Sequence, residues 1–403
     1  MTQTDWKSLK LQSNDITEGP ERAPARAMLR AMGLTDDDLY KPFVGIANLT
    51  SDVTPCNVHL DKFVKAAKEG VKQNNGTPFE FGTITVSDGI SMGTEGMKAS
   101  LVSREVIADS IEVVTFGERM DGLITVAGCD KNMPGCMMAI ARLNIPSIFV
   151  YGGSIMPGQF QDRDVNIQDV FEAVGAYSKG TMSAEDLHEL ECNACPGEGS
   201  CAGLFTANTM STAIEILGMS LPGDASVPAI NPSKIQQAQK AGEVLMEAMK
   251  AGIRPRDILT RDAFLNAITV VVSMGGSTNS VLHLMAIAKE ANVDLSLDDF
   301  DRLSRSTPYI ADMKPGGRFV MADLDRYGGV AVVGKRLLEA GLLKGDTLSI
   351  NGKTLAENLN STVTSDDQPI ISEVTSPRSP TGGLAILYGN LAPEGAVIKV
   401  AGH

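Results

Sequence analysis

The strongest constraint on the fold is an alternation of short apolar runs with longer amphipathic segments between residues 40 and 151. Four apolar runs have the length of β-strands: 43–48, 82–86, 123–127 and 147–151. The segments between them have helical spacing: 58–72, 103–116 and a stretch that ends at 143. Parallel strands need such crossover helices, which pack on the sheet. The sequence therefore predicts an α/β fold, with a large N-terminal domain of three layers, α/β/α, around a mostly parallel sheet.

Metal-ligand side chains follow three of the predicted strands. Cys56 follows the first, Asp88 follows the second, and Cys129, Asp130 and Lys131 follow the third. In open α/β sheets, ligands bind beyond the carboxyl ends of the strands, where neighbouring turns lie side by side. Thiolates favour iron or zinc, whereas carboxylates favour Mg²⁺, so one crevice could serve two metals.

Two further glycine-rich turns are candidates for the same crevice. Cys201 lies in GEGSCAGLFTANTM, which predicts a turn that enters a helix at about Ala202. A thiol at a helix N-terminus has its thiolate, the form that binds metal, stabilised by the helix dipole. The turn SMGGSTNS, residues 273–280, opens a helix predicted at 281–288, and its backbone N–H groups would suit a carboxylate or phosphate.

Each of these features also has a purely structural interpretation. The segment from Cys129 to Lys131 could be a turn with a buried thiol and two solvated charges. Asp88 could be a turn residue that accepts local hydrogen bonds. Cys136 is predicted to be a core residue, because it lies beside two methionines on the following helix.

The remaining cysteines and His188 are predicted to be unconnected with metal. Cys192 and Cys195 form a CxxC pair, but no second pair of Cys or His completes a zinc site. We therefore expect both to be structural. His188, in a polar segment, is expected to have no metal-ligand neighbour.

Composition limits the partners and the compartment. The 403-residue chain carries a net charge of −14, which disfavours nucleic acid and anionic membranes as partners. Its apolar runs are shorter than the roughly 20 residues that a membrane helix requires, and its N-terminus has no signal-peptide pattern. We expect a cytoplasmic protein in which metal ligation or catalysis is a better explanation of the cysteines than disulfides. An acidic substrate would need a local cation.

The C-terminal tail changes character. Residues 365–379 are rich in Ser, Pro, Asp and Thr and are predicted to be a linker. Two short β-like runs follow, with a predicted turn at 392–395. We therefore expect two domains, 1–364 and 365–403, of which the second is the incomplete beginning of a β-domain in a truncated chain.

Six long motifs, spread over nearly the whole chain, carry a family resemblance: TPCNVHL (54–60), TVSDGISMGTEGM (85–97), SLVSREVIADSIE (100–112), GCDKNMPGCMMA (128–139), GSCAGLFTANTM (199–210) and GGSTNSVLHL (275–284). On these residues the chain resembles the dihydroxy-acid and phosphogluconate dehydratase family. The segments GDTLSINGKTLAENL and GGLAILYGNLAPEGAVIK resemble that family's domain junction and the start of its C-terminal β-barrel.

The resemblance implies cofactors and site residues. It implies a 2Fe–2S cluster with one open iron position, held by Cys56, Cys129 and Cys201; three thiols suit a 4Fe–4S cluster equally well. It implies Mg²⁺ bound by Asp88, Asp130 and Lys131, the lysine as its N-carboxylated form. Substrate contacts are expected from Gly276, Ser277, Thr278 and Asn279. A homodimer is implied as well.

The implied activity is that of a hydro-lyase in valine and isoleucine biosynthesis. Its substrates would be 2,3-dihydroxy-3-methylbutanoate and the methylpentanoate homologue, which become 2-oxo acids. Mg²⁺ would bind the carboxylate and the C2 hydroxyl, while iron acts as a Lewis acid on the C3 hydroxyl. The alternatives are a dehydratase of an aldonate or phosphogluconate and a non-catalytic iron–sulfur protein. SDGISMGTEGM and SREVIADSIE favour the branched-chain members.

The family draws a Mg²⁺-ligating Glu and a catalytic Ser base from its C-terminal domain, and both are expected beyond residue 403. We therefore expect the 403-residue chain to have negligible dehydratase activity. Formation of 2-oxo acid under anaerobic, cluster-replete conditions measures this, and turnover at a rate typical of the family would contradict it.

Overall fold

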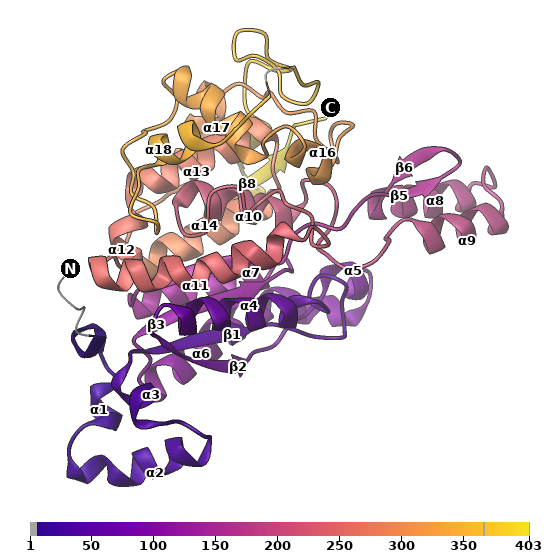
Figure 1. The fold of residues 1–403 in the computed structure, drawn as a ribbon. Helices are drawn as coiled ribbons and strands as arrows, with labels where there is room; N and C mark the ends of the chain where they lie inside the picture. Colours follow the sequence, from indigo (N-terminus) through magenta and orange to yellow (C-terminus); the bar gives the residue numbers. More distant parts are fainter. Residues whose placement is uncertain (1–5, 366, 403) are drawn as a thin grey trace.

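A computed structural model describes residues 6–365 and 367–402 (Figure 1). Its centre is a parallel sheet of four strands in the order β2-β1-β3-β4. The strands are β1 (Phe43–Asn48), β2 (Thr77–Gly82), β3 (Gly122–Ala127) and β4 (Ser147–Tyr151). Every residue of β3 and β4 is buried. This burial explains why both strands are continuous apolar runs, as expected for a sheet covered on both faces.

Helices cover both faces of this sheet. The four that do so are α4 (Leu60–Gln73), α6 (Lys98–Gly117), α7 (Asn132–Leu143) and α11 (Ser233–Ala251). The connection β1–α4–β2 runs toward one edge, whereas β2–α6–β3 and β3–α7–β4 run toward the other. Right-handed crossovers therefore place α4 on one face and α6 and α7 on the opposite face. α11 packs against α4, and α6 packs against α7. The predicted three-layer α/β/α architecture is confirmed.

The second predicted strand is wrong in position. Residues 83–86 (TITV) have the β-branched pattern of a strand, but β2 lies upstream at Thr77–Gly82. β1 ends at Asn48, whose carbonyl accepts the Thr83 N–H, so the chain beyond Thr83 has no strand beside it. Pro78 in β2 argues against a strand at this position, because proline lacks the N–H group that strand pairing uses. The sheet tolerates this proline because β2 is an edge strand.

A second group of helices packs against α7 through α10 and α14. Its members are α10 (Thr206–Leu217), α13 (Arg261–Met274), α14 (Asn279–Glu290), α15 (Leu297–Ser306) and α17 (Val330–Glu339). α14 contacts α7, and α13 lies against α10 and α15. The apolar run at 267–272 belongs to α13 and is buried throughout. The helix predicted to begin at about Ala202 begins only at Thr206, which changes the setting of Cys201.

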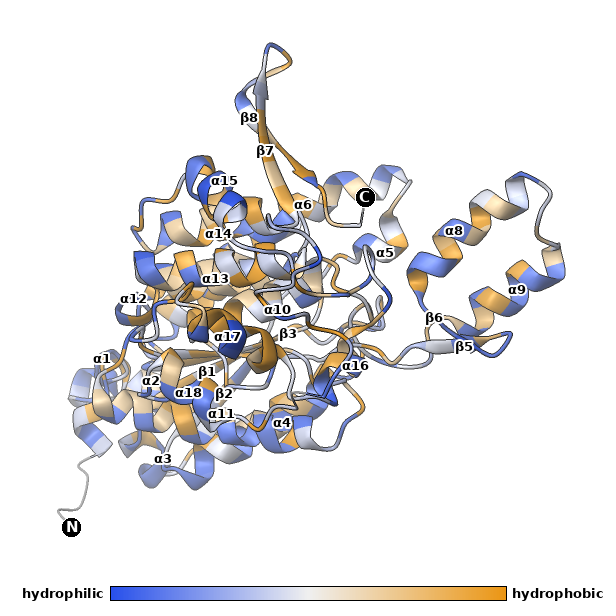
Figure 2. Ribbon diagram, turned by 90° about the horizontal axis from the view of Figure 1, so that it is seen from above, coloured by the Kyte–Doolittle hydropathy of each residue, from blue (hydrophilic) through white to orange (hydrophobic). Residues whose placement is uncertain are grey.

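An arm, residues 158–195, projects from the main body (Figures 1 and 2). It consists of the hairpin β5 (Gly158–Phe160) and β6 (Arg163–Val165) and the helices α8 (Ile167–Ser178) and α9 (Ala184–Asn193). The arm has a small hydrophobic cluster separate from the main core: Phe160, Val165, Ala173, Leu190 and Ala194.

The remaining elements are short. They are α1 (Asn14–Thr17), α2 (Ala23–Ala31), α3 (Asp36–Tyr40), α5 (Asp88–Ser91), α12 (Pro255–Ile258), α16 (Met321–Asp325), α18 (Leu355–Ser361) and the 3₁₀ turns η1 (Trp6–Leu9), η2 (Pro20–Arg22) and η3 (Glu95–Met97). Asp121 joins the N-terminal helices to the sheet, because its carboxylate accepts the backbone N–H groups of Ser13 and Phe43. Within the described part of the chain, every helix is too short or too polar to span a membrane.

The tail forms an antiparallel hairpin of β7 (Leu384–Gly389) and β8 (Ala392–Lys399), and β7 packs on α15. The predicted turn at 392–395 is wrong, because these residues belong to β8 and the turn lies at 390–391. Pro393 suggested a turn, but within residues 6–365 and 367–402 β8 pairs only with β7 and so tolerates a proline. The predicted domain boundary after residue 364 stays a prediction. Residues 366 and 403 of the predicted second domain lie outside the described residues.

Candidate active site and metal centre

The turns after β1 and β3 lie at the point where the connections of the sheet change direction. Such a switch point opens a crevice beyond the carboxyl ends of the strands. Cys56 comes from the first of these turns, and Cys129, Asp130 and Lys131 come from the second. The topology thus brings together two of the predicted ligand groups.

Glycines allow the cysteine-bearing turns to meet backbone to backbone. A Cβ on Gly128 would lie 2.0 Å from the carbonyl oxygen of Cys56, so no larger residue fits there without movement. Gly199, at φ +130°, donates its N–H to the Pro55 carbonyl at 2.9 Å. The Ser200 hydroxyl donates to the Gly128 carbonyl. These contacts lock the turns before Cys56, Cys129 and Cys201 to one another.

The three predicted cluster ligands line one cavity of about 590 Å³. The neighbouring Cys129 thiol lowers the pKa of Cys56, while the Cys56 thiol and burial raise the pKa of Cys129. Burial raises the pKa of Cys201. The expected helix-dipole activation of Cys201 is wrong, because four residues separate it from the start of α10 at Thr206. Its carbonyl instead accepts a hydrogen bond from the Asn208 amide at 2.5 Å.

Asp88, Asp130 and Lys131 form a buried ionic cluster beside the thiols. The Lys131 ammonium contacts the Asp88 carboxylate and lies 3.1 Å from Asp130. The Ser100 hydroxyl donates to Asp88 at 2.5 Å. Burial raises the pKa of Asp130; it opposes ionisation of Asp88 too, but hydrogen bonds from Lys131 and Ser100 hold the pKa of Asp88 below its usual value. Two carboxylates and an amine thus converge where a hard cation could bind.

Asn132, which sequence analysis missed, connects three ligand-bearing segments. Its side-chain carbonyl accepts the Cys129 N–H at 3.3 Å, the Asn57 amide at 2.9 Å and the Thr85 hydroxyl at 3.1 Å. Asn132 is fully buried. One oxygen therefore sets the spacing of the segments that follow β1, β2 and β3. A polar residue beside the ligand triplet, at the start of an apolar helix, is the only sequence signal for this role.

Three of the four predicted substrate contacts in the GGSTNS turn line the cavity. Ser277, Thr278 and Asn279 line the cavity, and the Asn279 amide donates to the Thr206 hydroxyl at 2.9 Å. Gly276 instead packs against Thr209, where an added Cβ would lie 2.8 Å from the methyl carbon. That these residues contact a substrate stays a prediction.

Two other cysteines differ in setting. Cys136 is fully buried in the main core, as predicted. Cys195, expected to be merely structural, lines the cavity together with Cys201. Lys399 of β8 also lines the cavity and was not identified from sequence, because nothing local distinguishes it from a strand lysine on the surface.

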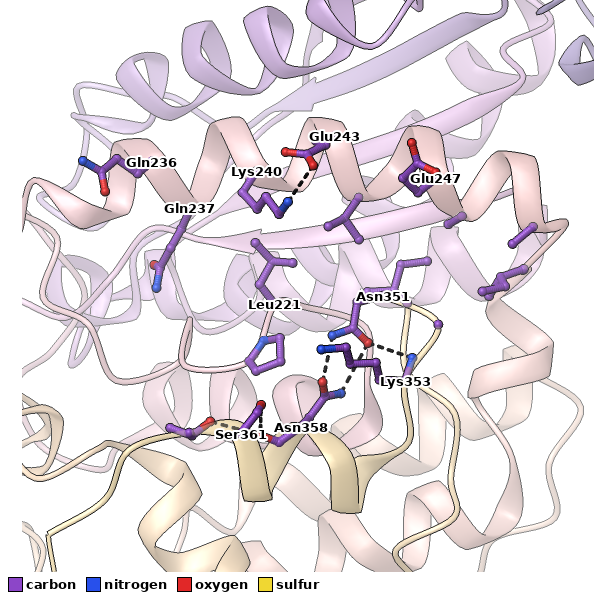
Figure 3. Close-up of a pocket in the computed structure, with 18 of the residues that line it drawn as sticks. Leu221, Gln236, Gln237, Lys240, Glu243, Glu247, Asn351, Lys353, Asn358 and Ser361 are labelled. Atoms are coloured by element: carbon purple, nitrogen blue, oxygen red, sulfur yellow. Dashed lines mark hydrogen bonds and ion pairs between the residues drawn. The ribbon is translucent and has the colours of Figure 1, made fainter. Parts of the chain in front are cut away.

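A larger hollow of about 830 Å³ lies between α11 and the region of α18 (Figure 3). Two of its charged side chains, Lys240 and Glu243, form an ion pair at 2.6 Å, and Glu247 pairs with Lys250 at 2.6 Å. Asn351 and Asn358 bond to each other across its floor. Its lining contains neither thiols nor histidines. The chemistry of the protein therefore centres on the smaller cavity.

Comparisons with known proteins identify the family to which the chain belongs. The model for the N-terminal domain of dihydroxy-acid/6-phosphogluconate dehydratase matches residues 41–358, and the C-terminal model matches residues 369–403. The chain is 56% identical to the dihydroxy-acid dehydratase of Natronomonas pharaonis, over 98% of this chain and 68% of that protein. It is 56% identical to that of Acidothermus cellulolyticus, over 98% and 71% respectively. It is 54% identical to that of Mycobacterium tuberculosis, over 98% and 70%.

We expect Asn132→Ala to impair metal binding in the cavity as well as to lower the stability of the fold. Loss of the carbonyl removes the acceptor that the Cys129 N–H, the Asn57 amide and the Thr85 hydroxyl share, and costs about 1–3 kcal/mol of unfolding free energy. Asn266→Ala is a matched control, since Asn266 is a buried amide that bonds Lys344 and Thr347 away from the cavity. Both variants should lose stability in urea titrations, but only Asn132→Ala should lose bound iron and sulfide after anaerobic reconstitution. Equal metal content in the two variants would contradict the role of Asn132.

Proposed function

Since this chain belongs to the dihydroxy-acid/6-phosphogluconate dehydratase family, we propose that its cavity binds 2,3-dihydroxy-3-methylbutanoate and the methylpentanoate homologue for loss of water. Membership places it among the dehydratases, which are hydro-lyases. The observation that carries the narrower proposal is the lining of the cavity, where thiols and carboxylates face a largely apolar wall.

The donor atoms suit the two proposed cofactors. Cys56, Cys129 and Cys201 would hold an iron–sulfur cluster, for which thiolates are the usual ligands, and we propose the 2Fe–2S form. Asp88 and Asp130 would hold Mg²⁺ through carboxylate oxygens. When bound, the two metals supply Lewis acidity for loss of the C3 hydroxyl and for acidification of the C2 proton.

Lys131 presents a difficulty that carboxylation would remove. As an ammonium between Asp88 and Asp130, it neutralises the carboxylates and repels a divalent cation. Reaction of the neutral amine with CO₂ would release a proton and replace the positive charge with a carbamate oxygen. We propose that Lys131 acts as a Mg²⁺ ligand in this form.

The cavity wall favours a branched-chain substrate over a sugar acid. Its apolar part is formed by Ile90, Met92, Met97, Ile155, Phe171, Leu204 and Phe205. A sugar acid has additional hydroxyl groups, which lose their hydration in such surroundings unless hydrogen bonds replace it. Alkyl substituents lose nothing by burial there. Among the described lining residues, Lys399 is the one cation available to meet a carboxylate.

A second copy of the chain is the proposed partner. Four residues of α6 share one exposed face of the helix: Val102, Val106, Val113 and Phe116. Their spacing keeps them within one arc of the helix. An exposed apolar stripe of this kind is typical of an interface, which supports a homodimer through α6.

The test of the proposed function uses metal content and the cluster spectrum. Anaerobically reconstituted protein should be coloured and contain iron and sulfide, and Cys129→Ala should abolish both. Cys136→Ala, which removes a buried thiol seven positions along the chain, should retain the cluster. Addition of 2,3-dihydroxy-3-methylbutanoate should shift the visible spectrum, whereas gluconate should not.

Colourless, iron-free wild-type protein after reconstitution would overturn the cofactor assignment. A spectral shift with gluconate or phosphogluconate alone would instead favour the sugar-acid alternative. A cluster that responds to neither compound would favour the non-catalytic iron–sulfur protein.

Substrate binding should weaken at alkaline pH because of Lys399. Burial lowers the pKa of Lys399 to about 8. The ammonium is present below that pH and is lost as the pH rises through it, so the attraction for the substrate carboxylate disappears. Titrations that follow the cluster spectrum should show the dissociation constant rising from about pH 7 to about pH 9. Lys399→Met should show weak binding throughout, and Lys353→Met, at the other hollow, should behave like wild type. An unchanged pH profile in Lys399→Met would contradict this role.

A further inference from the structure

The arm brings together residues that sequence analysis treated separately. His188, Glu191 and Cys192 lie on the last two turns of α9. One candidate ligand atom from each lies within 4.8 Å of the others. The expectation that His188 lacks a metal-ligand neighbour is therefore wrong, because helical spacing places positions i, i+3 and i+4 on one face.

The hydrogen bond between His188 and Glu191 fixes the state of the imidazole. Nδ1 of His188 lies 2.9 Å from Oε1 of Glu191. An ionised carboxylate only accepts hydrogen bonds, so Nδ1 must carry the hydrogen. In the neutral ring, Nε2 then presents its lone pair on the opposite side. A carboxylate that orients a histidine in this way is the usual outer partner of a metal-bound imidazole.

Nε2 faces the thiol of Cys192. The distance from Nε2 to Sγ is 3.8 Å. Zinc bond lengths of about 2.0–2.1 Å to nitrogen and 2.3 Å to sulfur, at a tetrahedral angle, place the two ligand atoms about 3.5 Å apart. A small rotation of either side chain would close this difference. His188 and Cys192 can therefore chelate one cation while α9 stays intact.

The electrostatic setting favours a cation. Cys192 lies in the last turn of α9, where the terminal carbonyl groups carry partial negative charge. The chain as a whole is strongly acidic. The side chains of His188 and Glu191 are 74% and 56% exposed, so the cation would keep water in its remaining positions. This exposure also disfavours a nucleophilic Cys–His pair, which would need a pocket to hold a substrate.

We infer that His188 and Cys192 form a second metal site, oriented by Glu191, for a thiophilic divalent cation of the zinc type. Nitrogen and sulfur ligands select such ions over Mg²⁺. The site is separate from Cys56, Cys129 and Cys201, and the inference does not depend on the proposed dehydratase function.

Cobalt(II) is a suitable probe, because its thiolate complexes absorb in the near ultraviolet and visible. Titration of the whole chain with Co²⁺ under anaerobic conditions should give a thiolate band that is absent from Cys192→Ser. The difference between the two proteins isolates this site whether or not the cavity holds a cluster. Zn²⁺ should displace the cobalt and remove the band.

Matched variants separate the ligands from their surroundings. His188→Ala should abolish the difference band, and Glu191→Gln should weaken Co²⁺ binding about tenfold. Glu189→Gln removes the same charge from another face of α9 and should leave binding unchanged. Cys195→Ser should retain the band.

An identical cobalt spectrum in wild type and Cys192→Ser would overturn the inference. So would a band that is lost in Cys195→Ser but retained in Cys192→Ser, or a wild-type band that forms only at millimolar Co²⁺.

Discussion

The site depends on the close approach of two backbone turns at the centre of the sheet. The turn after β1 and the turn after β3 meet where the Gly128 Cα lies against the Cys56 carbonyl. The strands deliver both turns to one edge, and the glycine lets them touch. With a Cβ at Gly128 the turns would have to separate, and the ligand-bearing side chains that follow Cys56 and Gly128 would move apart with them.

The ionic cluster shows why such a site needs a rigid scaffold. Asp88, Asp130 and Lys131 are largely removed from water, and each charge must be balanced by the others. Losing one member would leave an uncompensated charge, which is among the more destabilising changes a protein core can undergo. Ser100 and Asn132 hold the surrounding segments in register and so keep this balance. The groups that can bind metal are therefore also groups that stabilise the fold around them.

Much of the fold could be predicted, because buried strands have continuous apolar runs in the sequence. β1 and β4 are continuous apolar runs, and their bounds coincide with the predicted 43–48 and 147–151. β2 could not be placed, because an edge strand tolerates Pro78 and the stronger pattern at 83–86 has no neighbour to pair with. The setting of Cys201 depends on an irregular turn before α10, which periodicity does not reveal. Asn132 and Lys399 acquire their positions from residues far away in the sequence, so no local pattern identifies them.

The arm has a consequence for how the cavity behaves over time. Phe171 contributes to the cavity wall, yet the helix that carries it packs on a hydrophobic cluster of its own, separate from the main core. A unit with a small hydrophobic cluster of its own has a lower free energy of local opening than the sheet beside it. One wall of the cavity thus belongs to a part of the molecule with low local stability. The other walls belong to the main core, where local stability is highest. Amide hydrogens of α8 should therefore exchange faster than those of the sheet strands that end at the cavity.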